Sequence, residues 1–190
     1  MNEEQITQEE YILEVLKDDL NTGRYPILQK SPSLITNANL LSEDENQKRL
    51  KLIQNNGAFG RIFEIRNFVA FYKSQIKQEE FLELFWCPKG NETDQDGIDL
   101  MSDNTRNIAK LIAFLKKEYL GTDPKIIQQI KSFFNEEIRK DKEIRLFLFE
   151  TSRSKLIIDG NHRAGAIVKS ISQENIENVF PITVYVAKIS

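Results

Sequence analysis

The most constraining feature of the sequence is the stretch 155–169, where a short apolar run, a tight turn and an amphipathic pattern follow one another directly. Residues 155–158 (Lys-Leu-Ile-Ile) are apolar at three consecutive positions, which is typical of a buried strand. The run ends at the Asp159-Gly160 step, a dipeptide that marks turns. After it, apolar residues recur at the i, i+3, i+4, i+7 spacing of a helix, at Ala164, Ile167, Val168 and Ile171. The stretch is therefore predicted to form a strand, a turn and a helix.

A polar cluster, Asp159-Gly160-Asn161-His162-Arg163, falls on the turn and the first helical residues. A helix N-terminus presents unpaired N–H groups and the positive end of the dipole, so cationic side chains are unfavourable there. His162 and Arg163 are placed against that preference. A bound anion reverses the sign, because backbone amides, imidazole and guanidinium then face one negative charge. We therefore expect a phosphate site, with Gly160 allowing the backbone to approach the ligand closely.

The same residues allow a purely structural interpretation. In it, Asp-Gly is an ordinary turn, Asp159 caps the helix through its side chain, and Arg163 is a solvated residue paired with Asp159. The sequence alone leaves both interpretations open.

A strand, then Gly-x-His-Arg opening a helix with small residues, then a further strand at 181–187, resembles the nucleotide-binding core of the ParB/sulfiredoxin-like superfamily. That superfamily includes ParB partition proteins, sulfiredoxins, free-serine kinases and the "DGQHR" proteins associated with DNA modification. The resemblance covers residues 144–188. It implies that Gly160, Asn161, His162 and Arg163 bind ATP or another nucleotide, with or without magnesium.

Two activities follow from the resemblance. The first is phosphoryl transfer or nucleotide hydrolysis, by a small-molecule kinase or NTPase in which Asp159, His162 and Arg163 are the catalytic residues. The second is a non-catalytic nucleotide-sensing or DNA-associated accessory module of a plasmid, phage or defence system, with DNA or another protein as partner.

Departures from the superfamily pattern narrow these activities. Sulfiredoxins carry a catalytic Cys where this chain has Asn161, which argues against sulfinic-acid reduction. ParB proteins have Glu at that position, Arg in place of His162 and a further Arg in place of Gly165, which argues against partition-type CTP switching.

His162 is the only histidine in the chain, so any imidazole-dependent step must use it. A three-histidine metal site within one chain is excluded, and a Ser-His-Asp hydrolase of the Gly-x-Ser-x-Gly type lacks its motif. In phosphoryl transfer, His162 and Arg163 would neutralise phosphate charge. Glu150 and Glu64 are candidate bases because they adjoin apolar runs, whereas Asp159 is better suited to fixing His162 than to taking protons.

Composition bounds the partners and the compartment. A length of 190 residues suits a single domain. The net charge of −3 gives no overall basic footprint, which argues against DNA binding as the primary role but leaves a local patch open. A single cysteine, Cys87, fits a reducing compartment, and the sequence has no run long enough to span a bilayer. We therefore expect a soluble, cytoplasmic protein that makes no membrane contact.

The fold is predicted to be α+β: a small mixed sheet containing the strand-turn-helix motif in residues 144–190, and a mainly helical portion in residues 1–143. The helical portion begins with capping boxes at Thr7–Glu10 and Ser42–Glu45, each opening an amphipathic helix. Residues 24–41 contain two prolines and are interpreted as extended chain, with a short edge strand at 25–28. A strand is predicted at 62–66, while residues 67–75 fit either a strand or a helix.

The middle of the chain contains a dense apolar segment at 80–87, an acidic loop at 88–103, and helices at 103–121 and 123–138. The loop's acidic spacing does not match a calcium loop, so no metal site is predicted, although one of its carboxylates could hold Mg²⁺ together with a nucleotide. Strands are predicted at 145–149, 155–158 and 182–186, the last with Ile182, Val184 and Val186 on one face.

Overall fold

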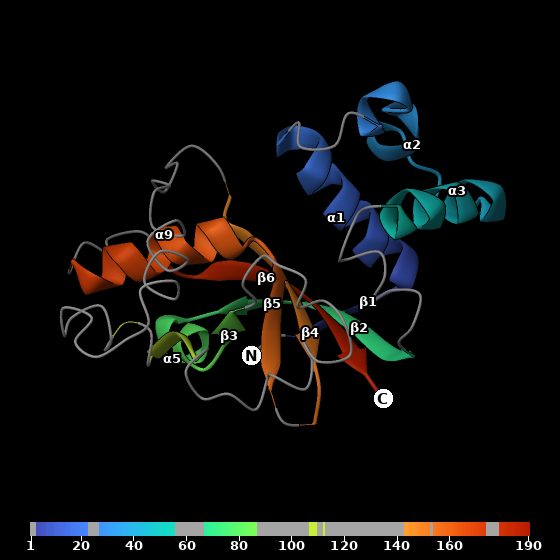
Figure 1. Ribbon diagram of the computed structural model, residues 1–190. Coiled ribbons are helices and arrows are strands. Elements are labelled where there is room, and N and C mark those ends of the chain that lie inside the picture. The colour runs from blue at the N-terminus through green and yellow to red at the C-terminus, as the bar shows by residue number, and fades with distance from the viewer. Residues whose placement is uncertain are drawn as a thin grey trace.

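The described residues form an α+β fold in which helices pack on both faces of one mixed six-stranded sheet (Figure 1). The computed structural model describes residues 3–22, 27–55, 67–86, 107–109, 112, 143–152, 154–173 and 179–190. The strands are β1 (Glu4–Ile6), β2 (Phe68–Ile76), β3 (Phe85–Trp86), β4 (Arg145–Glu150), β5 (Lys155–Asp159) and β6 (Ile182–Ile189). The helices are α1 (Gln8–Thr22), η1 (Leu28–Lys30, a 3-10 helix), α2 (Ser33–Thr36), α3 (Glu43–Gln54), α5 (Gln78–Leu82) and α9 (Asn161–Ser172). The predicted fold class is confirmed.

The strand order is β1-β2-β6-β4-β5-β3. The β1–β2, β2–β6 and β4–β5 pairs are antiparallel, whereas β4–β6 and β3–β5 are parallel. The portion 1–143 therefore contributes β1, β2 and β3 to the same sheet as the C-terminal strands. The prediction of a mainly helical portion missed these strands. β1 and β3 are short, and the sequence of β2 fits the periodicity of a helix as well as that of a strand.

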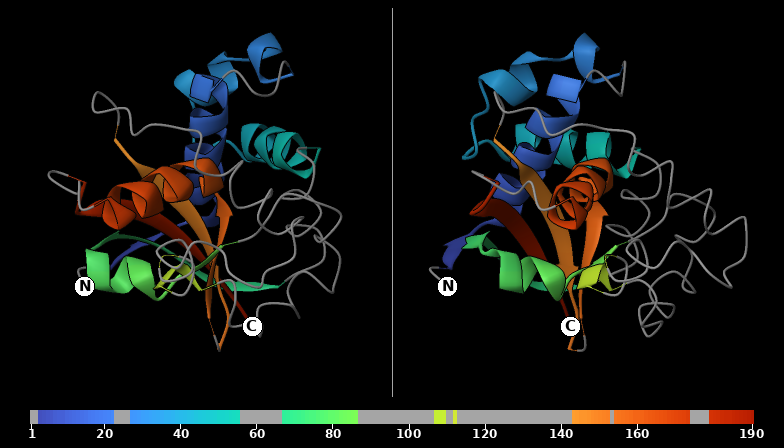
Figure 2. Two further views of the ribbon diagram at one scale, coloured as in Figure 1. Left: turned by 60° about the vertical axis from the view of Figure 1, so that its left-hand side comes forward. Right: turned by 90° about the vertical axis from the view of Figure 1, so that its left-hand side faces the viewer.

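Two hydrophobic cores lie on opposite faces of the sheet. On the α9 face, α9 and α5 cover the sheet, and β6 contributes Ile182, Val184 and Val186 as predicted. On the α1 face, α1, α2 and α3 cover it, and β6 contributes Tyr185, Ala187 and Ile189. This division follows from the two-residue period of a strand. In both views of Figure 2, α1, α2 and α3 (blue to teal) lie together, above α5 (green).

The first predicted capping box is confirmed at the start of α1. The Thr7 N–H donates to Glu10 Oε2 at 2.6 Å, and the Glu10 N–H donates to Thr7 Oγ1 at 3.1 Å. The second box is only half formed. The Glu45 N–H donates to Ser42 Oγ at 3.4 Å, but the Glu45 carboxylate accepts from the Asn39 N–H at 3.0 Å instead of the Ser42 N–H. Glu45 is turned away because it also pairs with Arg49.

The extended chain predicted for residues 24–41 is wrong at residues 28–30 and 33–36, which are helical. Leu28 lies in η1, not in an edge strand, and Ser33–Thr36 form α2. Pro32 caps α2 with φ −63°. A proline is compatible with the start of a helix, where its missing N–H is not needed, so its presence does not exclude helix here.

The structure also decides residues 68–75, which form most of β2. Several predicted features lie outside the described residues: the strand at 62–66 with Glu64, Cys87, the acidic loop at 88–103, the helix at 123–138 and most of the helix at 103–121. Ile108 and Ile112 are described, and both are buried in the core of the α9 face.

Candidate functional site

The predicted strand-turn-helix is present, with Gly160 as the hinge between β5 and α9. Gly160 adopts the left-handed conformation (φ 86°, ψ 13°) and occupies the N-cap position, and its carbonyl accepts from the Ala164 N–H at 2.8 Å. The expectation that Asp159 is the N-cap is therefore wrong. Asp159 Oδ1 instead accepts from the Gly160 N–H at 2.7 Å, which fixes the turn. A glycine N-cap supplies no side chain to the amides of the first turn of α9.

Gly160 packs closely against β4. A Cβ atom at this position would lie 2.8 Å from Leu146 Cδ2, 3.0 Å from the Arg145 carbonyl oxygen and 3.1 Å from Arg163 Nη2. The first contact is closer than Cβ atoms are found in real structures, and the other two are tighter than most Cβ contacts. The absence of a side chain at Gly160 therefore allows the turn to approach β4 and the Arg163 guanidinium, in addition to any role toward a ligand.

Arg163 reaches out of α9 to the C-terminal part of α1. Its Nη1 lies 2.5 Å from Asp18 Oδ1, and the two side chains are 27% and 12% exposed. Burial by itself lowers the pKa of the Arg163 guanidinium, but the hydrogen bond and charge of Asp18, with the charges of Asp159 and Asp19, raise that pKa overall. The structural interpretation of Arg163 as a solvated residue paired with Asp159 holds only in part, since the ion pair is with Asp18 while Asp159 acts on the guanidinium through its charge.

A second arginine also forms an ion pair with an acidic residue of α1. Arg145 Nη1, at the start of β4, lies 2.8 Å from Glu14 Oε2, one helical turn before Asp18. The Tyr185 hydroxyl donates to the same Glu14 oxygen at 3.2 Å. Burial, followed by the Glu14 charge, raises the pKa of Tyr185. Sequence reasoning missed Glu14 and Asp18 as site residues. The available signal was their four-residue spacing on the acidic polar face of this helix.

The remaining residues of the motif lie in the first turn of α9. Asn161 is buried, and its side-chain amide donates to the Ile158 carbonyl at 3.4 Å, so it helps to hold the turn. His162 is partly buried beside it. Asp159, Gly160, Asn161, His162 and Arg163 are thus brought together at the end of β5, as their adjacency in sequence requires.

The candidate base Glu150 lies elsewhere. In the β4–β5 hairpin Glu150 is opposite Lys155, whereas Phe147 is opposite Asp159. Three residues of strand separate the two positions, which corresponds to about 10 Å. The carboxylates that do lie near Arg163 are Asp18, Asp19 and Asp159. Glu64, the other candidate base, is outside the described residues.

Loss of the Arg163 side chain is expected to destabilise the fold. Arg163→Ala leaves the Asp18 carboxylate, which is mostly buried, without its main cationic partner, and removal of one member of such a pair costs about 1–3 kcal/mol. Chemical denaturation measures the loss. The double variant Asp18→Ala/Arg163→Ala is expected to be less destabilising than the sum of the two single substitutions. Each single substitution leaves one unpaired charge, whereas the double variant has neither charge. Strict additivity would contradict a direct ion pair.

Among the described residues, no group of three or more His, Cys, Asp or Glu side chains is arranged to hold a metal ion. No helix in the described part is both long and apolar enough to cross a bilayer.

Comparison with known proteins adds no relative to this geometry. A scan against protein-family models gives no match, and neither a search of curated proteins nor a search of solved structures gives one.

Proposed function

We propose that this protein binds a nucleotide through its phosphate at the N-terminus of α9. The observation that carries the proposal is the start of α9 directly after β5, with a glycine N-cap, Asn161 and His162 in the first turn. Backbone amides at such a terminus, with the positive end of the helix dipole, favour an anion. The resemblance of this motif to the ParB/sulfiredoxin-like core supports the same ligand.

The charges around Arg163 bear on the form in which the nucleotide binds. Asp18, Asp19 and Asp159 all act on the guanidinium, so the one positive charge is accompanied by three negative charges. A bare polyphosphate would be repelled by that excess. We therefore expect the nucleotide to bind as its magnesium complex, because magnesium is commonly held by one or two carboxylates together with substrate phosphates.

In this proposal the motif residues have distinct roles. The amides of the first turn and the His162 imidazole contact the phosphate, and Asn161 and Asp159 hold the turn in position. Arg163 acts mainly by joining α9 to α1. Phosphoryl transfer or nucleotide hydrolysis would take its carboxylate from Asp18, Asp19 or Asp159.

The alternative is a nucleotide-sensing or DNA-associated module without turnover. It is favoured by the engagement of Asp18 with Arg163 and of Asp159 with the Gly160 N–H, since neither carboxylate is then available to orient a nucleophile. The cytoplasmic nucleotide pool would supply the ligand in either case.

Nucleotides are expected to stabilise the protein against heat. A ligand at about 100 times its dissociation constant adds about 2.7 kcal/mol to the free energy of unfolding. We expect this for ATP, ADP or CTP with magnesium, a smaller effect without magnesium, and none for the His162→Ala variant. Differential scanning fluorimetry with each variant compared with its own ligand-free state provides the measurement.

Lys169→Ala is the matched control, because Lys169 lies on α9 but in its last turn. This variant is expected to retain the full nucleotide shift. If no nucleotide shifts the wild-type transition, or if His162→Ala shifts as much as the wild type, the proposed phosphate site is wrong. If a nucleotide does bind, a second assay separates the two functions. Release of phosphate, or transfer of a labelled γ-phosphate, that is lost in His162→Ala would indicate an enzyme, and binding without turnover would indicate a module.

A further inference from the structure

A cavity of about 320 Å³ lies on the α9 face of the sheet, between strands β2, β4 and β6 and the segment 80–85. None of the residues 159–163 lines it. Its floor consists mainly of apolar side chains from β2, β4 and β6: Tyr72, Ile76, Leu148, Val184 and Val186. The volume is at the lower end of the range for small-molecule sites, which are mostly apolar with a few placed polar groups.

Ser74, on β2, is a polar group in this lining. The residue is 4% exposed, and its Oγ makes no hydrogen bond to any described residue. A buried hydroxyl without a partner is unfavourable, and such groups are infrequent in folded proteins. The Ser74 hydroxyl is thus a buried polar group that a ligand in the cavity could satisfy.

Glu150, at the end of β4, is a second such group. Its Oε2 is buried and accepts no hydrogen bond from the described residues. Two lysines compensate its charge at longer range, with Lys155 Nζ 3.5 Å from Oε2 and Lys188 Nζ 4.0 Å from Oε1. Lys155 Nζ also lies 5.7 Å from the centre of the Tyr72 ring, so the lysine is held over the cavity floor.

Strand register places the two groups well apart on the sheet. Ser74 is opposite Val184 on β6, and Glu150 is opposite Lys188 on the other side of β6. They are therefore four residues apart along the strands and two strands apart across the sheet, which corresponds to about 13 Å and about 10 Å. Apolar floor residues lie between them, so a ligand that reaches both groups must be elongated.

The charges of the lining restrict the ligand. Three glutamates, Glu80, Glu83 and Glu150, line the cavity and would repel an anion. An ammonium group at Glu150 would also meet Lys155 and Lys188, which already compensate that carboxylate. A neutral hydroxyl avoids both conflicts because it donates to the carboxylate and can accept from a lysine. We propose that this cavity binds an uncharged, elongated small molecule with an apolar body and a hydroxyl group at each end, one donating to Glu150 Oε2 and one bonded to Ser74 Oγ.

The test uses 4,4′-biphenol, which has this pattern, and compares it with 4-phenylphenol, which lacks one hydroxyl. Amide chemical shifts of the ¹⁵N-labelled full chain are followed during titration. We expect 4,4′-biphenol to shift amides of β2, β4 and β6 and to bind about fivefold or more tightly than 4-phenylphenol, as the loss of one hydrogen bond predicts. Charged biphenyl analogues, a carboxylate and an aminomethyl compound, are expected to bind more weakly still.

Two variants distinguish a ligand site from a structural role. Ser74→Ala is expected to keep or raise the melting temperature, since it removes a hydroxyl without a described partner, and yet to weaken 4,4′-biphenol about fivefold. Glu150→Gln is expected to weaken it as well. Ser172→Ala is the control, because the Ser172 hydroxyl donates to the Lys169 carbonyl on α9 and does not line the cavity.

The proposal is overturned if 4,4′-biphenol causes no shift in these strands up to its solubility limit. It is equally overturned if 4-phenylphenol binds as tightly, or if Ser74→Ala binds 4,4′-biphenol like the wild type. These outcomes are independent of the nucleotide experiment, because the two sites share no residue.

Discussion

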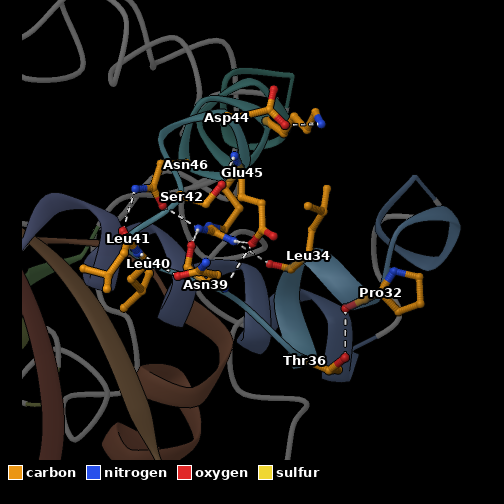
Figure 3. Close-up of polar contacts among 12 residues, drawn as sticks. Pro32, Leu34, Thr36, Asn39, Leu40, Leu41, Ser42, Asp44, Glu45 and Asn46 are labelled. Atoms are coloured by element: carbon orange, nitrogen blue, oxygen red, sulfur yellow. Dashed lines mark hydrogen bonds and ion pairs between the residues drawn. The ribbon is translucent and has the colours of Figure 1, made fainter.

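Arg49→Met is expected to lower the free energy of unfolding by about 3 kcal/mol, because several acceptors lose their donor and each unsatisfied polar group costs about 1–3 kcal/mol. Arg49 lies in α3 and is 1% exposed. Its Nη1 donates to the Leu34 carbonyl at 3.0 Å and to Glu45 Oε2 at 3.1 Å. Its Nη2 donates to the Asn39 carbonyl at 3.0 Å and to the Asn46 side chain. Figure 3 shows these four acceptors converging from α2, α3 and the loop between them.

Methionine fills much of the arginine volume but donates no hydrogen bond, so these acceptors lose their common donor. The measurement is the midpoint of urea unfolding at unchanged m-value. Lys48→Met is the matched control. Lys48 pairs with Asp44 at 2.5 Å on the same helix, but the two side chains are 55% and 75% exposed. Such exposed pairs contribute about 0–1 kcal/mol. Equal effects of the two substitutions would show that the Arg49 network does not hold α2 and α3 together.

Gly160→Ala is expected to destabilise the protein by about 3 kcal/mol or more. The left-handed conformation costs a residue with a side chain about 1–2 kcal/mol, and overpacking against Leu146 and the Arg145 carbonyl adds a further amount of similar size. The backbone oxygen of β4 is held by the sheet and yields less readily than a side chain. Thermal and chemical denaturation both report the loss.

Gly160→Asn separates the two causes. Asparagine tolerates the left-handed region better than alanine but carries the same Cβ. If backbone conformation dominates, Gly160→Asn will be clearly more stable than Gly160→Ala. If the contact with β4 dominates, the two variants will be similarly unstable. Stability within about 0.5 kcal/mol of the wild type for Gly160→Ala would contradict both contributions.

The sequence predicted what is encoded by local pattern. The strand at 155–158, the turn and the following helix were predicted from an apolar run, an Asp-Gly step and a helical period. All are present, with the strand reaching Asp159 and the helix beginning at Asn161. The N-cap assignment failed for a local reason as well. In an Asp-Gly step either residue can hold the N-cap position, and here the glycine takes it, because its left-handed backbone brings the turn against β4.

The acidic partners of Arg163 and Arg145 could not be predicted from local sequence pattern. Arg163 and Asp18 are 145 residues apart in sequence, and Arg145 and Glu14 are 131 residues apart. Neither pairing has a periodic signature, because it depends on how α1 lies across the sheet. The motif could therefore be identified, but whether Arg163 faces solvent, a ligand or another helix could not.

The edge strands were missed for a different reason. β1 is mostly exposed and β3 is two residues long, so neither shows the alternation that marks a half-buried strand. They are strands because a neighbour offers backbone hydrogen bonds, with β1 pairing along β2 and β3 along β5. Pairing of this kind is a property of the assembled sheet.

The central position of β6 has a consequence for how the molecule can be made. Its two neighbours, β2 and β4, are separated by about seventy residues of sequence and meet only through β6, which follows both in the chain. On a ribosome, β1 with β2 and β4 with β5 can form separate antiparallel pairs early, but the two pairs cannot share a sheet until β6 has emerged. Such dependence on late, long-range pairing slows folding and leaves two strand edges exposed to other chains in the interval.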